Sequence, residues 1–424
     1  MTEDCTLKRL KVGYAETDIT PTIPIETIGF NRKDNVSRGI LKPLLAQVTV
    51  WEAEELCCLI TIDSIGFKKE LCDEVRNIVG KALGVSNDKV MICFSHCHSA
   101  PNADTAPKYF QLVCKKIEAA VKEAVIQMQE VSVGWGNAHV DIGVNRRKES
   151  KKLDPRAGIL KVCDVKSNAM KLLIIRLTAH CNALKRDNYM ISPDFFGDIR
   201  ETLQNEYNCP VMIIQGAAGN IAPKYFKSQE IPVDAMGEQY IKSETALEDI
   251  AREVFLQTAP LIKKIKVNER HDIRMYSRST VLYAQVPAYD TAQKIAQEAE
   301  ENCGIDGREW IEEIKRLNSG GVEQQEEYVE IQYFKIGQWC LCGVPYELMV
   351  EFAIRSMEAV NNEFFYMNGY TNGCLSYFPT EEEFDKGGYE VYWSMLLYYS
   401  YYNRVFPLKR ESAAELVEFT VANA

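Results

Sequence analysis

The sequence has no long hydrophobic run and no excess of positive charge. No stretch approaches the ~18 consecutive apolar residues that a membrane helix needs. The opening stretch, MTEDCTLKRLKVGYAE, lacks the apolar core of a secretory signal. Lys and Arg number 49 against 60 Asp and Glu, giving a net charge of −11, whereas surfaces that bind phosphate backbones are rich in Lys and Arg. We therefore expect a cytoplasmic protein that binds no nucleic acid and has no integral membrane segment.

The chain also lacks internal repeats, low-complexity linkers and paired Cys-x-x-Cys motifs. Its 424 residues are 46% hydrophobic and 26% charged, which is ordinary for a globular protein. The 14 cysteines lie mostly inside apolar runs, and their spacing does not fit a cysteine zinc site. We interpret them as reduced, buried side chains. We expect a single domain over residues 1–424.

Short apolar runs that end in polar residues alternate with helical patterns. The runs include LCCLITI, KVMICF, KLLIIRL and VMIIQ, and their continuous apolar character is typical of strands buried on both faces. Helical spacing covers residues 67–84, 109–129, 289–304, 307–321 and 345–363. This interleaving predicts an α/β or mixed α+β fold, with central sheets covered by helices and a site where strands end.

Histidine is scarce, yet two of the five histidines are separated by a single residue. His96 and His98 follow a buried run in MICFSHCHSAPNAD, and His180 follows another in KLLIIRLTAHC. This pattern indicates either a metal or catalytic site or a coincidence within a loop. We interpret His139 and His271 as structural.

Three further features each have two readings. Cys97 and Cys181 are interpreted as small fillers, with thiolate ligation the weaker alternative. Asp63 either orients a site histidine or caps the following helix. The turn Gly216–Asn220 either shapes a wall of the site or is a tight turn between strand and helix.

Eight segments in order resemble one family. They are VGYAETDITP with TIGF, ITIDSIG, FSHCHSAP, GVNRR, LTAHCNAL, QGAAGNIAPK, GVPYEL and NGCLSYFPTEEEFDKGGYE. Together they resemble the catalytic domain of the neutral/alkaline, non-lysosomal ceramidases, which are zinc-dependent amidases. The resemblance spans about residues 10–400.

The resemblance implies one zinc ion per chain and a set of site residues. Zinc would be held by His96, His180, Glu347 and Tyr377. His98, Arg146 and Tyr389 would lie beside the substrate carbonyl, with His98 as the candidate to protonate the leaving group. The expected substrate-binding residues are Gly29, Asp63, Gly219 and Asn220. Two histidines with a carboxylate and a phenol would also suit manganese or iron.

Two departures from the family bear on the substrate. Ala222 stands where the family has a serine, so a serine nucleophile there is excluded. The chain ends soon after the last matching segment, and we expect no C-terminal β-sandwich domain. We expect a metal-activated water to cleave an amide, ester or lactone of a small polar or N-acyl substrate.

Two alternatives to this function remain open. One is a lipid amidase acting on N-acyl sphingoid bases, and another is a non-catalytic homologue that binds metal or ligand.

The tyrosine-rich stretch Tyr392–Phe406 is interpreted as a packed helix rather than a binding surface. Residues Val233–Gln257 and Tyr289–Gly321 either cover the site or form a subunit interface.

Overall fold

Two β-sheets form the centre of the molecule in this computed structural model, which describes residues 8–30, 32–147, 149–224 and 245–424. The larger sheet has strand order β11-β9-β8-β6-β1-β3-β4-β5, and the smaller has order β13-β14-β15-β17. Both are mixed, since β4–β5, β9–β11 and β15–β17 are parallel pairs. The larger sheet comprises β1 (Lys11–Asp18), β3 (Leu45–Glu52), β4 (Leu56–Ile62), β5 (Val90–Phe94), β6 (Gln129–His139), β8 (Arg156–Asp164), β9 (Met170–Leu177) and β11 (Val211–Gln215). The smaller comprises β13 (Ile273–Gln285), β14 (Gln324–Ile336), β15 (Trp339–Gly343) and β17 (Phe365–Asn368).

Short paired strands and nine named helices complete the described elements. The pairs are β2 (Gly39–Ile40) with β10 (Met190–Ile191), β7 (Gly143–Asn145) with β12 (Ile221–Pro223), and β16 (Glu347–Leu348) with β18 (Tyr377–Phe378). The helices are α1 (Lys69–Leu83), α2 (Pro107–Ile126), α3 (Asp194–Tyr207), α4 (Thr245–Ile262), α5 (Tyr289–Cys303), α6 (Arg308–Ser319), α7 (Val350–Val360), α8 (Ser394–Tyr402) and α9 (Ser412–Ala422). None of these described helices has the length and apolar character needed to cross a membrane.

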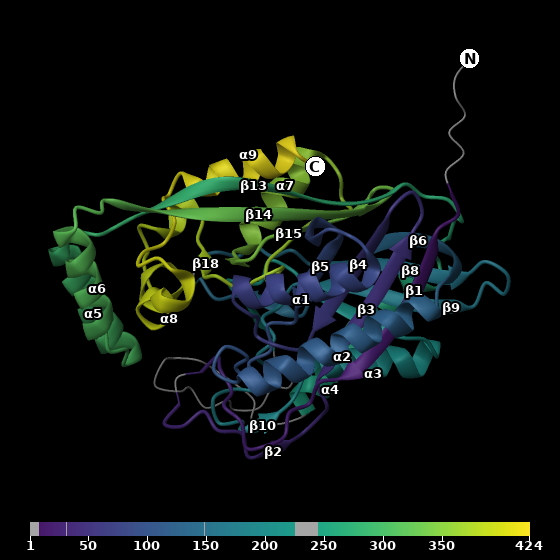
Figure 1. Cartoon of the computed structure of the whole chain (residues 1–424), viewed down its shortest axis with the longest axis horizontal. Helices are drawn as coiled ribbons and strands as arrows, with labels where there is room; N and C mark the ends of the chain where they lie inside the picture. Colours follow the sequence, from purple (N-terminus) through teal and green to yellow (C-terminus); the bar gives the residue numbers. More distant parts are fainter. Residues whose placement is uncertain (1–7, 31, 148, 225–244) are drawn as a thin grey trace.

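The two sheets pack face to face between layers of helices. Ile60 and Ile92 of the larger sheet pack toward α1–α4, while Leu59 and Met91 pack against the smaller sheet. Helices α7 and α9 cover the other face of the smaller sheet, as Figure 1 shows. The strands are therefore buried on both faces, which explains their continuous apolar runs. The predicted mixed α/β architecture is confirmed, with the addition that the two sheets also cover each other.

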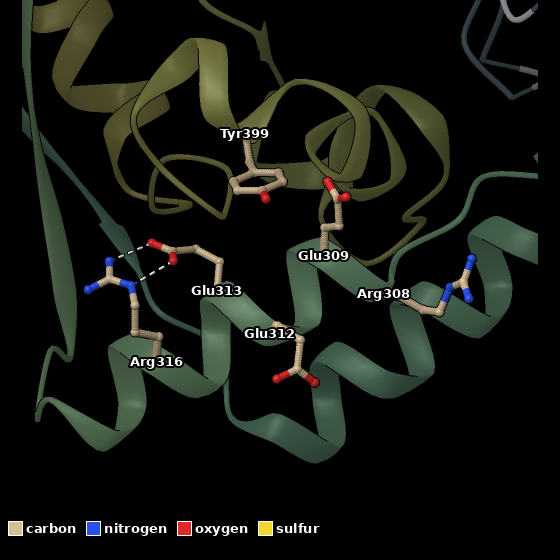
Figure 2. A pocket seen from close by; sticks show the side chains of 6 residues that line it. All are labelled: Arg308, Glu309, Glu312, Glu313, Arg316 and Tyr399. Carbon is tan, nitrogen blue, oxygen red and sulfur yellow. Dashed lines mark hydrogen bonds and ion pairs between the residues drawn. The ribbon is translucent and has the colours of Figure 1, made fainter.

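The helical hairpin α5–α6 extends between β13 and β14 at one end of the molecule (Figure 1). Ala296 and Trp310 of this hairpin pack against Leu396 of α8. The predicted insert Tyr289–Gly321 thus supports α8 rather than covering the cavity described below. A surface hollow beside it is lined by Arg308, Glu309, Glu312, Glu313, Arg316 and Tyr399 (Figure 2). That hollow contains only surface charges and one phenol, and Arg316 pairs with Glu313 within it.

Two helical predictions need correction at their boundaries. The stretch 345–363 was expected to be helical from near Pro345, but α7 begins at Val350 because Glu347 and Leu348 pair with β18 instead. The insert Val233–Gln257 lies partly outside the described residues, and its described part belongs to α4.

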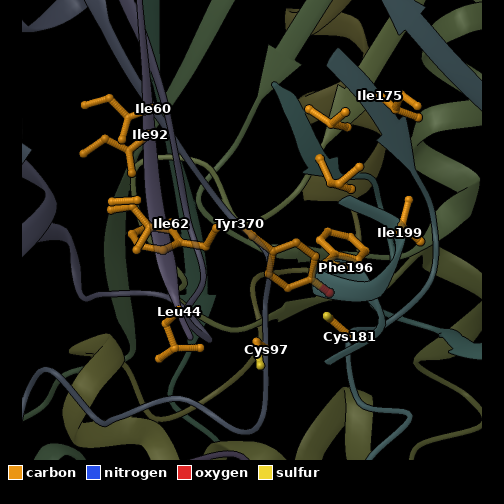
Figure 3. Packing of buried hydrophobic residues seen from close by; sticks show 14 of the residues in the cluster. Leu44, Ile60, Ile62, Ile92, Cys97, Ile175, Cys181, Phe196, Ile199 and Tyr370 are labelled. Atoms are coloured by element: carbon orange, nitrogen blue, oxygen red, sulfur yellow. The ribbon is translucent and has the colours of Figure 1, made fainter. Parts of the chain in front are cut away.

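Buried thiols contribute to the core between the larger sheet and α3. Cys97 and Cys181 lie near Phe196 and Tyr370 (Figure 3). The Cys97 thiol donates to the carbonyl oxygen of Ser192 at 2.8 Å. Burial raises the pKa of both the Cys97 and Cys181 thiols, so both stay protonated near neutral pH. This agrees with the filler interpretation, and all the described cysteines are free thiols.

Candidate metal and catalytic site

Loops that follow four strands of the larger sheet meet at one place. The amide of Cys97, in the loop after β5, donates to the carbonyl of Ser64 in the loop after β4 (3.1 Å). The amide of His98 donates to Cys181 in the loop after β9 (3.3 Å). The amide of Gly219, after β11, donates to Leu348 of β16 (2.7 Å). These backbone bonds fix the loops relative to one another, so side chains far apart in sequence converge.

Three buried histidines point their Nε2 atoms toward a common centre. Their Nδ1 atoms each lie beside a backbone carbonyl oxygen: His96 beside Ile65 (2.7 Å), His98 beside Gly29 (2.9 Å) and His180 beside Ala218 (3.2 Å). Because a carbonyl only accepts, each Nδ1 carries a proton that points to its carbonyl oxygen. The Nε2 atoms of His98 and His180 are 3.0 Å apart.

Glu347 and a tyrosine complete the buried cluster. The Glu347 Oε2 atom lies 3.1 Å from His96 Nε2 and 3.9 Å from His180 Nε2. Tyr370 stacks on the His96 ring, with ring centroids 4.2 Å apart, and its hydroxyl donates to Glu347 Oε2 at 3.5 Å. His96, His98 and His180 form one group close enough to bind a metal ion, and His96, Glu347 and Cys374 form another.

Burial determines the protonation of this cluster. It lowers the pKa of both His98 and His180 well below the usual range, and the neighbouring His96 lowers both further. The rings are therefore neutral near neutral pH. Two neutral imidazoles whose lone pairs face each other repel, so a cation bound at His180 or a proton taken up by His98 would relieve the repulsion.

Tyr377 and Tyr389 lie on the other side of Glu347. In the parallel pair β16–β18, Glu347 and Tyr377 are register partners, so their side chains emerge on the same face. The Tyr377 and Tyr389 rings pack edge to face, 6.0 Å apart. Burial raises the pKa of both phenols well above 10.0, so both hydroxyls remain proton donors.

Arg146 brings a cation to this side of the site. Its guanidinium carbon lies 6.0 Å from the Tyr377 ring centroid. It donates to the Gly219 carbonyl, and its Nε atom lies 3.5 Å from Glu390 Oε1. Although burial lowers the pKa of Arg146, Tyr377 and Glu390 outweigh this effect and raise the pKa above its usual value. A permanent positive charge therefore lies beside Tyr377.

The four expected substrate-binding residues take different positions. Gly29 lines the cavity, and its carbonyl orients His98. Gly219 contacts the site through its backbone, and a Cβ there would lie 2.5 Å from the Glu347 carbonyl oxygen. Asn220 lies behind the site, where its Oδ1 accepts from the Val350 amide that begins α7 (2.8 Å).

Asp63 has neither of the two roles considered for it: it does not orient a site histidine, and it does not cap the helix that follows. Its carboxylate pairs with Arg200 at 2.7 Å and accepts from the Leu45 amide at 2.9 Å. The helix that follows, α1, has Lys68 at its N-cap with no side-chain cap. Asp63 therefore braces α3 against β3 and is not among the residues that line the cavity.

A cavity of about 70 Å³ opens beside the cluster. Three tyrosines of α8 line it, which the packed-helix interpretation of Tyr392–Phe406 did not anticipate. Tyr370, Cys374 and Asp104 were likewise not singled out, because neither spacing nor strand ends mark them. The lining residues are Ile28, Gly29, Ile65, Gly66, Phe67, Lys68, His96, His98, Asp104, Glu347, Cys374, Tyr377, Tyr389, Tyr398, Tyr401 and Tyr402.

The remaining histidines lie elsewhere. His139 is exposed at the end of β6. The His271 ring packs on Trp135 (centroids 5.0 Å apart) and its Nε2 lies 3.2 Å from the Val133 carbonyl. Neither is among the residues that line the cavity.

Comparison with known proteins identifies the fold. No protein-family model matches the chain, and no curated protein matches its sequence. Two solved structures match over 98% of this chain and 74% of their own. They are neutral ceramidase from Pseudomonas aeruginosa (TM-score 0.72, 17% identity) and a ceramidase complexed with C2 (TM-score 0.70, 17% identity). The chain therefore has a neutral ceramidase-like fold, as the resemblance predicted.

Proposed function

We propose that the protein is a metal-dependent hydrolase that cleaves an amide or ester bond. The observation that carries this proposal is the convergence of three imidazole Nε2 atoms and the Glu347 carboxylate beside a tyrosine-lined cavity. The neutral ceramidase-like fold supports it, since both matching structures are ceramidases.

The donor set fits zinc. His96, His180 and Glu347 would hold the ion, with Tyr377 as the fourth ligand. Imidazole nitrogen and carboxylate oxygen are the donors that catalytic zinc sites use. The nearby Nε2 of His98 stays free to act on the substrate. When bound, zinc polarises a carbonyl group and lowers the pKa of a bound water.

The surrounding residues supply the rest of the chemistry. Arg146, fixed by Gly219 and Glu390, places a positive charge where a carbonyl oxygen becomes negative. The Tyr389 hydroxyl donates to the same oxygen. His98, whose Nε2 faces the centre with a lone pair, would accept a proton from the attacking water and pass that proton to the leaving group.

The cavity wall favours an N-acyl or acyl-ester substrate. Ile65 and Phe67 form an apolar side, and the α8 tyrosines present rings with hydroxyl groups. Lys68 and Asp104 add opposite charges among the lining residues. Such a wall suits a short apolar acyl group that is joined to a polar partner.

Metal content and turnover test the proposal together. Wild type, purified without added metal, is expected to hold about one zinc ion per chain by elemental analysis. His180→Ala should lose it, while His139→Ala, which changes an exposed histidine, should keep it. Two substrate series are tested, nitrophenyl esters and nitroanilides, each with acetyl, hexanoyl and dodecanoyl groups. Zinc-loaded wild type should hydrolyse members of at least one series. Absence of zinc from wild type after soaking in zinc would overturn the proposal.

A further inference from the structure

Arg147, the neighbour of Arg146, binds the segment that carries Tyr389. Its Nε lies 2.5 Å from Glu383 Oε2, and its Nη1 lies 3.1 Å from Glu390 Oε2. Its Nη2 donates to the Gly387 carbonyl at 2.9 Å. The three side chains are 12%, 5% and 12% exposed, so these ion pairs are shielded from water. One guanidinium thus joins three points of the stretch 383–390.

That stretch has a backbone that needs an external restraint. Gly387 and Gly388 have φ values of 61° and 89°, a region that glycine enters at little cost. Tyr389 follows directly and begins the π-helix Tyr389–Trp393. Glycines leave the chain free to choose other conformations. Backbone bonds to the Glu383 carbonyl and the Lys386–Glu383 ion pair hold the first turn of the stretch. The contacts of Arg147 connect that turn to Glu390, next to Tyr389, whose ring packs against Tyr377.

The same contacts also reach Arg146. Glu390 divides its two oxygens between the neighbouring arginines, with Oε2 on Arg147 and Oε1 3.5 Å from Arg146 Nε. Without Arg147, Glu390 would hold only one cation and would be free to pull the Arg146 guanidinium from its place beside Tyr377. The position of the site cation therefore depends on its neighbour.

We propose that Arg147 is a positioning residue that fixes Tyr389 and Arg146 beside the histidine cluster, an inference that rests on the proposed function. Arg147 lies among none of the residues that line the cavity. It acts through Glu383, Glu390 and the Gly387 carbonyl. Its loss should misplace the two groups that face the substrate oxygen while leaving His96, His180 and Glu347 in place.

The test compares Arg147→Gln and Arg147→Lys with a matched control. Arg355 also binds two carboxylates of the adjacent turn, Glu381 at 2.7 Å and Glu382 at 2.9 Å, but contacts neither Glu383 nor Glu390. Arg355→Gln therefore removes a similar ion pair from the neighbouring turn. All variants are measured as full chains for zinc content, hydrogen exchange and hydrolysis of nitrophenyl acetate.

The rate of amide hydrogen exchange measures how firmly the segment around Tyr389 is held. The amides of Val391, Tyr392 and Trp393 bond the Gly388 carbonyl at 3.3, 2.9 and 3.3 Å. In Arg147→Gln their exchange should be about ten-fold faster than in wild type, and in Arg355→Gln it should be unchanged. In Arg147→Gln zinc content should stay at the wild-type value, and kcat should fall about a hundred-fold with little change in KM. Arg147→Lys, which keeps the charge but not the three-point contact, should be intermediate.

Two outcomes would overturn the inference. One is exchange at residues 391–393 that is the same in Arg147→Gln and Arg355→Gln. The other is a loss of zinc in Arg147→Gln equal to the loss in His180→Ala, since that would make the role general to the fold. If Arg147→Gln does not fold, the Arg147→Lys comparison decides by the same criteria. If wild type hydrolyses no substrate, the proposed function fails. The exchange rates at residues 391–393 still show whether Arg147 holds the segment that carries Tyr389.

Discussion

The Nε2 atoms of His98 and His180 lie 3.0 Å apart, each with its Nδ1 proton donated to a backbone carbonyl. Two lone pairs so close exclude a direct hydrogen bond between these rings while both are neutral. The geometry places His98 as near to the centre as the two proposed histidine ligands, so the role of His98 needs an experiment of its own.

His98→Ala separates a proton carrier from a metal ligand. We expect this variant to retain about one zinc ion per chain and to lose about a hundred- to ten-thousand-fold in kcat, because proton transfer to the leaving group is lost. Elemental analysis and steady-state kinetics measure both. Tyr377→Phe is the counterpart and should weaken zinc binding. If zinc is lost from His98→Ala and kept in Tyr377→Phe, the two assignments must be exchanged.

Gly29→Ala should displace the His98 ring while leaving the imidazole itself unchanged. Gly29 has a φ of 115°, and an added Cβ would lie 2.6 Å from His98 Nδ1. We expect turnover to fall about ten- to a hundred-fold because the carbonyl that orients the ring must shift. The free energy of unfolding should fall by about 1–3 kcal/mol.

Gly304→Ala is the control for this substitution. Gly304 also has a positive φ, 64°, but an added Cβ would meet nothing within 4 Å. Turnover should be unchanged, and the loss of stability should be about 1 kcal/mol. Equal losses of turnover in the two variants would show that backbone strain alone explains the effect.

The Asp154–Arg176 pair should make stability depend on pH in acid. Arg176 Nη1 lies 2.7 Å from Asp154 Oδ2, and Arg156 binds the other oxygen at 2.7 Å. Burial would raise the pKa of the Asp154 carboxyl, but the two arginines outweigh it and lower the pKa from 3.8 to about 2. The stabilisation is therefore complete above pH 3.8 and is lost as the pH falls through about 2.

Urea unfolding of wild type and Asp154→Asn tests whether this stabilisation is lost as the pH falls. Asp154→Asn should be less stable at neutral pH, because Arg176 is left buried without its carboxylate. The difference between the two proteins should shrink by about 2 kcal/mol as the pH falls from about 5 to 2. A difference that stays constant over that interval would exclude a lowered pKa at Asp154.

Ala222→Ser tests whether the missing family serine limits the substrate range. Ala222 lies in β12 opposite Val144 of β7, and a hydroxyl there should change the free energy of unfolding by less than about 0.5 kcal/mol. Hydrolysis of nitrophenyl acetate should be unchanged, because the proposed chemistry uses no protein nucleophile. A gain of activity on an N-acyl sphingoid base, measured by release of the free base, would instead favour the lipid amidase alternative.

The sequence pattern was sufficient for the fold class and for part of the site. Continuous apolar runs predict buried strands such as β4 and β5, and polar residues at their ends drew attention to His96, His98 and His180. Glu347 also follows an apolar run, but its spacing alone does not mark it as a ligand. Tyr377 came only from the resemblance, because a two-residue ladder such as β16–β18 leaves no periodic signal. Their roles remain a prediction.

Other parts of the site depend on long-range packing that one sequence does not reveal. The partner of Asp63 is Arg200, more than a hundred residues away along the chain. The stretch Ser394–Tyr402 is apolar around its circumference. Its packing against α5–α6 on one side and against the core of the smaller sheet on the other decides that Tyr398, Tyr401 and Tyr402 face the cavity. Such facing is set by tertiary contacts rather than by local propensity.

The proposed ligands come from both halves of the two-sheet arrangement, and this has a consequence for biosynthesis. His96 and His180 follow strands of the larger sheet, whereas Glu347 lies between β15 and β17 of the smaller sheet and Tyr377 follows β17. When the ribosome has synthesised the larger sheet, the nascent chain contains only the two imidazole ligands of the proposed set. The carboxylate and the phenol emerge after β13–β15, so the nascent chain assembles the complete donor set only near the end of translation. Metal capture would then mark a chain whose two sheets have already docked.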